Sequence, residues 1–96
     1  MTQPREFDRL LDSIIDAMPE IFDAHQAQRW YEQHFPEEFS ADLNRYGRDE
    51  HVFARDLSKA IDRRIDVKQI GTSQHTTNMR GRLSTCTVWQ KVMATA

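Results

Sequence analysis

The sequence is poor in the residues that cross-link a chain or anchor it in a membrane. Its one cysteine, Cys86, cannot form a disulfide within the 96 residues, which favours a reducing compartment. No apolar run approaches the roughly 20 residues that a membrane-spanning helix needs. The first residues, Met-Thr-Gln-Pro-Arg-Glu, lack the basic and then apolar pattern of a secretory signal. We therefore expect a cytoplasmic protein with a single domain over residues 1–96.

The signatures of common catalytic and metal sites are also missing. The four histidines include no pair at i, i+4, and no second cysteine joins Cys86. The chain has no glycine-rich phosphate loop and no G-x-S-x-G turn. Nothing marks two carboxylates as an acid–base pair, and a metal site would need ligands from distant segments. We therefore expect no enzymatic activity, no catalytic residue, no cofactor and no metal.

Charge is divided unequally between the two halves of the chain. Residues 1–46 carry ten acidic and four basic side chains, a net charge of −6, whereas residues 47–96 carry five acidic and nine basic ones, a net charge of +4. Between Arg63 and Lys91, Asp66 is the only acidic residue against six basic ones. Such an asymmetry is typical of a chain that contacts an anionic partner, although ordinary solvated charges remain an alternative.

Helical periodicity is clearest at the start of the chain. Pro4 suits the first turn of a helix, and Pro19 would end that helix. Between them the apolar residues recur at i, i+3, i+4, i+7, i+8 and i+11, as Phe7, Leu10, Leu11, Ile14, Ile15 and Met18. This stripe is predicted to face the core.

Two shorter helices are predicted next. Asp23 is placed to cap the second helix, because its carboxylate can accept a hydrogen bond from the amide three residues further on. Trp30 and Tyr31 lie on the apolar face of this helix and are expected to fill the core, although both would also suit a protein interface. Pro36 ends the second helix and suits the first turn of the third, and Gly47 suits the position after the third.

A fourth helix is predicted to end near Ile65, where the period changes from 3.6 to 2. Its start is ambiguous, because Asp49 and Asp56 are both capable caps. Its apolar face comprises Phe53, Leu57, Ala60, Ile61 and Ile65. Its opposite face offers four hydrogen-bond donors, Arg55, Ser58, Lys59 and Arg63. The helical part is thus expected over residues 4–65.

The last third of the chain is rich in residues that favour strands. One strand is predicted over residues 67–71 and a second over residues 83–91, joined by a polar loop over residues 72–82. Such a long loop is usually functional in a compact domain. Trp89 is predicted to be buried against the helices. The predicted fold is α+β, with a four-helix N-terminal part followed by an antiparallel β-hairpin over residues 67–91.

Residues 37–91 resemble the winged helix-turn-helix superfamily. The run over residues 53–61, followed by a basic hairpin that closes on Val88 and Trp89, is loosely similar to the C-terminal winged-helix domains of phage and plasmid primase-helicases. The resemblance implies a recognition helix, a hairpin that acts as a wing, and binding to DNA. The candidate DNA contacts are the donors of the fourth helix and the hairpin, namely Arg55, Ser58, Lys59, Arg63, Arg64, Lys68, Arg80 and Arg82.

The predicted function is therefore a small DNA-binding protein of phage or mobile-element type. It would act on double-stranded DNA in replication or transcription control. The alternative is a protein–protein interaction module that binds or inhibits a host factor through its acidic helical face. Salt separates the two, because binding through phosphate contacts weakens steeply as salt rises. The sequence leaves the target site, the pathway and the oligomeric state open.

Overall fold

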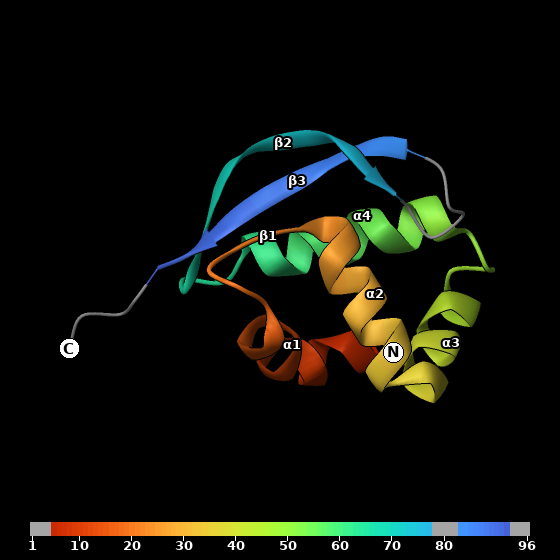
Figure 1. The fold of residues 1–96 in the computed structure, drawn as a ribbon. Helices are drawn as coiled ribbons and strands as arrows, with labels where there is room; N and C mark the ends of the chain where they lie inside the picture. Colours follow the sequence, from red (N-terminus) through yellow and green to blue (C-terminus); the bar gives the residue numbers. More distant parts are fainter. Residues whose placement is uncertain (1–4, 78–82, 93–96) are drawn as a thin grey trace.

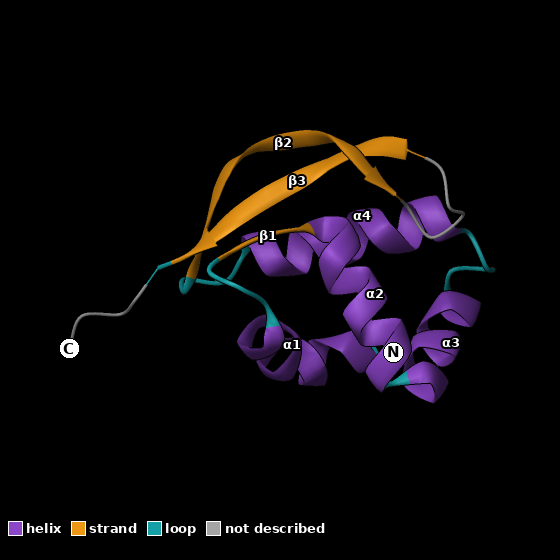
Figure 2. Ribbon diagram, in the orientation of Figure 1, coloured by secondary structure: helices purple, strands orange, loops and turns teal. Residues whose placement is uncertain are grey.

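The computed structural model describes residues 5–77 and 83–92, with the backbone alone at residues 73–75 and 77. The described elements run in the order α1 (Glu6–Ala17), β1 (Ile21–Asp23), α2 (Ala24–His34), α3 (Pro36–Arg45), α4 (Glu50–Asp62), β2 (Val67–Thr77) and β3 (Leu83–Lys91) (Figure 1). The three strands form an antiparallel sheet in the order β1-β3-β2. Figure 2 shows the helices gathered on one side of the strand pair β2–β3, which arches over α4. The predicted α+β class is confirmed.

The α1 helix buries the stripe that the sequence predicts. The buried side chains of this stripe are Phe7, Leu10, Leu11, Ile14, Ile15 and Met18. The Phe7 ring meets the Phe53 ring of α4 edge to face, with 5.9 Å between centroids. The helix begins at Glu6, and Pro4 lies outside the described residues. Within residues 5–77 and 83–92, no helix is both long and apolar enough to cross a bilayer.

Local capping signals position α2 and α3 as the sequence predicts. The Asp23 carboxylate accepts a hydrogen bond from the amide of Gln26 at 2.8 Å and so caps α2. Pro36 is the first residue of α3, and Gly47, which follows that helix, has a φ of +63°. Tyr31 is fully buried, as expected of a core residue.

The β1 strand is an element that the sequence does not predict. It spans only three residues, too few to show a period, and it leads directly into the cap of α2. It pairs with β3, where Phe22 lies opposite Trp89. The sheet therefore has three described strands rather than the two predicted, because β1 gains its hydrogen bonds from a segment at the other end of the chain.

Two further expectations are wrong at their boundaries. The β2 strand continues to Thr77, so residues 72–77 belong to a strand rather than to the predicted loop. Pairing with β3 extends β2 this far, with Thr72 opposite Thr87 and irregular register on either side. Ile65 is 96% exposed, although the helical count places it in the core. The α4 helix ends at Asp62, so the i, i+4 relation no longer holds at Ile65.

Candidate functional site

A groove of about 530 Å³ lies between α2, α4 and β3. The strand pair β2–β3 arches over α4 (Figure 1). Residues of this helix line the groove. Three of the candidate DNA contacts line it, namely Arg55, Ser58 and Lys59. The other lining residues come from β3 and from α2, and His25 of α2 is one of them. The structure thus brings part of the predicted binding face into one groove.

The cations of α4 occupy its exposed edge. Arg55 and Lys59 lie in α4, and Arg63, the residue that caps its C-terminal end, is counted with them; the three are spaced four residues apart and are exposed. Arg55 lies 3.6 Å from the carboxylate of Asp56, its neighbour in the chain. Within the described part of the chain, neither Lys59 nor Arg63 forms an ion pair. These two cations are therefore available to an anionic partner.

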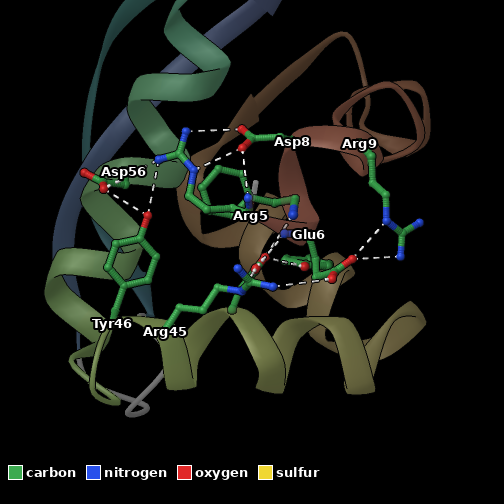
Figure 3. Close-up of polar contacts among 10 residues, drawn as sticks. Arg5, Glu6, Asp8, Arg9, Arg45, Tyr46 and Asp56 are labelled. Atoms are coloured by element: carbon green, nitrogen blue, oxygen red, sulfur yellow. Dashed lines mark hydrogen bonds and ion pairs between the residues drawn. The ribbon is translucent and has the colours of Figure 1, made fainter. Parts of the chain in front are cut away.

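Arginines of the acidic half are already paired with carboxylates. Arg5 Nε lies 3.1 Å from Asp8, and Arg9 lies 2.8 Å from Glu6 (Figure 3). Arg45 of α3 approaches the same Glu6 at 3.8 Å and so joins α3 to α1. An anion that bound these arginines would have to displace their carboxylate partners, so they are poorer anion contacts than the cations of α4.

Arg64, a candidate DNA contact, is held by carboxylates from two elements. Its Nε and Nη2 donate to Asp66 at 3.0 Å each, and Nη1 lies 2.5 Å from Asp12 of α1. Arg64 donates hydrogen bonds to Asp66 and Asp12, which raise the pKa of Arg64, and accepting from Arg64 lowers the pKa of Asp66. Arg64 therefore ties the turn after α4 to α1.

Replacing Arg64 with alanine should lower the free energy of unfolding at neutral pH by about 0.5–1 kcal/mol, because the groups it pairs with are partly exposed. The pairing depresses the pKa of Asp66 below its ordinary 3.8. The stabilisation is thus present above that pH and disappears as pH falls through the folded-state pKa. Urea denaturation of both proteins over a series of pH values measures the difference. Asp66→Asn should show only part of this loss, because Arg64 keeps its pairing with Asp12. A difference between the unaltered protein and Arg64→Ala that persists undiminished in acid would contradict the assignment.

The remaining candidates are dispersed. Ser58 is half-buried in the groove. Lys68 is exposed on β2 and does not line the groove. Arg80 and Arg82, the predicted contacts of the hairpin tip, lie outside the described residues.

A hydrogen-bonded cluster that the sequence does not predict lies at the groove around His25. His25 is in the first turn of α2, and its side chain is buried. Its Nδ1 lies 2.6 Å from Thr76 Oγ1, and its Nε2 lies 3.3 Å from Ser84 Oγ. Thr76 Oγ1 also lies 3.2 Å from Cys86 Sγ. Burial lowers the pKa of His25, because desolvation disfavours the charged imidazolium.

Asp23 completes this cluster from the end of β1. Asp23, His25 and Cys86 each have one potential metal-ligand atom that lies within 4.8 Å of those of the other two. The three residues meet because β1 pairs with β3, where Asp23 lies opposite Val88. No spacing in the sequence signals this meeting, since Cys86 is distant in the chain. Carboxylate, imidazole and thiolate are all groups that bind zinc.

Two chemical capacities are thus present. The exposed edge of α4 can neutralise an anionic polymer, and the cluster beside it offers three metal-ligating groups. Comparison with known proteins adds no further assignment: no family model matches the chain, and no curated protein or solved structure matches it either.

Proposed function

We propose that this chain binds double-stranded DNA through α4, used as the second helix of a helix-turn-helix. Helices α3 and α4 are consecutive and are joined by residues 46–49. This connection contains Gly47, whose φ of +63° lies in the left-handed region. Two helices joined by a short turn with a glycine are typical of the motif, and its second helix enters the major groove.

The observation that carries the proposal is the contrast between the cations of α4 and those of the helices before it. Lys59 and Arg63 are exposed and have no ion-pair partner among residues 5–77 and 83–92, whereas Arg5 and Arg9 are paired. A cation without a carboxylate partner gains the full benefit of contacting a phosphate, because it breaks no existing pair. Phosphate contacts of this kind supply most of the affinity of non-specific DNA binding.

The surroundings of α4 support the same proposal. Ser58 and Thr87 line the groove beside the cations and can donate hydrogen bonds to phosphate oxygens. The strand pair β2–β3 follows α4, as the wing of a winged helix-turn-helix follows its recognition helix. The sequence adds Arg80 and Arg82 between these strands, outside the described residues. DNA binding of this kind suits a protein of replication or transcription control.

The double variant Lys59→Ala/Arg63→Ala should weaken binding to every duplex by a similar factor, because phosphate contacts do not read sequence. The plot of log affinity against log salt should flatten by about 0.9 for each lost contact, and so by nearly 2 if both cations engage B-DNA. Fluorescence anisotropy with a labelled mixed-sequence duplex, repeated over a series of salt concentrations, measures both quantities.

Arg9→Ala is the matched control for the single variants Lys59→Ala and Arg63→Ala. It removes the same charge from α1, where Arg9 is paired with Glu6, and should change neither the affinity nor the salt slope. The proposal is overturned if the unaltered protein shows no salt-sensitive binding to duplex DNA. It is also overturned if Arg9→Ala weakens binding as much as Lys59→Ala does. In either case the acidic helices become the surface to test with protein partners.

A further inference from the structure

We propose that Asp23, His25 and Cys86 form a binding site for a divalent transition-metal ion of the zinc class. Their ligand atoms already lie within 4.8 Å of one another. The set combines one carboxylate, one imidazole and one thiolate, a mixture that suits zinc and cobalt better than magnesium or calcium. This proposal does not rest on the proposed DNA binding, since none of the three residues is among the candidate DNA contacts.

The geometry requires only a small contraction to hold an ion. In a tetrahedral site with bonds of about 2.0–2.3 Å, the ligand atoms lie about 3.3–3.8 Å apart. The three groups therefore have to close by about 1 Å. Asp23 and His25 are fixed by the start of α2, and Cys86 is fixed by the pairing of β3 with β2, in which it lies opposite Ser73. The backbone thus holds all three ligands near their positions in a complex.

The neighbouring hydroxyl groups can orient the ligands. Each ring nitrogen of His25 has a hydroxyl partner, Thr76 on Nδ1 and Ser84 on Nε2. Whichever nitrogen binds the ion, the other keeps a hydroxyl that fixes the ring, as the outer partners of metal-bound histidines commonly do. Asp23 Oδ1 accepts the capping hydrogen bond from Gln26, and a carboxylate has lone pairs enough to cap a helix and bind an ion together.

The groove supplies both an entry path and the remaining coordination position. His25 and Cys86 line it, so an ion can reach them from solvent. Three protein ligands leave a fourth position for water or an anionic group, as in zinc sites that keep an open position. A bound ion would join the segment from β1 to α2 directly to β3, and so would hold the strand pair β2–β3 in place over α4.

Titration with Co²⁺ tests the proposal on the full chain prepared without a polyhistidine tag. We expect one ion per chain, with a thiolate-to-cobalt charge-transfer absorption and visible bands of tetrahedral cobalt that Zn²⁺ abolishes by displacement. Zn²⁺ should also raise the midpoint of thermal unfolding, because it binds the folded state more tightly than the unfolded state. A folded protein that shows no charge-transfer absorption overturns the proposal.

Two variants separate ligation from folding. Cys86→Ser should abolish the charge-transfer band and weaken Zn²⁺ binding by more than about 10-fold. Loss of a residue that only hydrogen-bonds to a metal ligand already weakens metal binding by about that factor. Asp23→Asn keeps a good helix cap, so an equal loss of affinity would report the missing carboxylate ligand. His34→Gln, which alters an exposed histidine of the same helix, is the control and should bind as the unaltered protein does. Undiminished binding by both Cys86→Ser and Asp23→Asn overturns the site.

Discussion

Trp89→Ala should lower the free energy of unfolding by about 3–5 kcal/mol, the usual range for a large aromatic side chain removed from a core. Trp89 is fully buried, and its ring lies 5.5 Å from that of Phe22. Its Nε1 also donates a 2.6 Å hydrogen bond to Asp62 at the end of α4. Alanine would leave a cavity where the sheet meets the helices. Urea denaturation followed by circular dichroism measures the loss.

Two other variants define the origin of that loss. Trp89→Phe keeps most of the buried ring but removes the donor to Asp62, so it should lose less stability than Trp89→Ala. Trp30→Ala removes a tryptophan that is only partly buried and stacks on His34 at 4.4 Å, so its effect should also be smaller. A loss below about 1 kcal/mol for Trp89→Ala would place this residue outside the core.

Asp42→Ala should lower the free energy of unfolding by a comparable amount, about 3–5 kcal/mol, because it leaves several donors without an acceptor at about 1–3 kcal/mol for each buried one. Asp42 lies in α3 and is fully buried. Its Oδ1 accepts from the amide of Glu6 at 2.7 Å, and its Oδ2 accepts from the amide of Phe7 at 2.9 Å. The hydroxyl of Tyr31 donates to Oδ2 at 2.7 Å. Alanine would leave these donors without their acceptor, at the start of α1 and in α2.

Conservative variants test whether the hydrogen bonds, rather than the volume, carry this effect. Tyr31→Phe removes a single donor to the carboxylate and should cost about 1.5–3 kcal/mol. Asp42→Asn keeps the size of the side chain but places its NH₂ group, a donor, where one carboxylate oxygen accepted a hydrogen bond. Its loss of stability should therefore fall between those of Tyr31→Phe and Asp42→Ala. Glu37→Ala, which alters an exposed carboxylate of the same helix, is the control. An Asp42→Ala loss no larger than that of Glu37→Ala would contradict the network.

Local patterns suffice to predict most of the helices. The stripe of α1 repeats over a dozen residues, and the cap at Asp23 acts on an amide three residues away. Pro36 and Gly47 restrict or permit backbone angles at their own positions. Each of these signals works within a few residues, so the sequence alone predicts these helices and most of their buried side chains. The β3 strand, Leu83–Lys91, is likewise predicted from a local run of residues that favour strands, and its Trp89 is buried as expected.

Only the tertiary structure decides which distant groups meet. The strand β1, the extension of β2 to Thr77 and the acceptor role of Asp42 all depend on partners far along the chain. The candidate site follows the same division. The sequence places Lys59 and Arg64 in one basic segment, but the fold pairs Arg64 with Asp12 and leaves Lys59 exposed. The meeting of Asp23 and His25 with Cys86 likewise has no signature in the sequence, because it arises from the pairing of two strands that lie far apart in the chain.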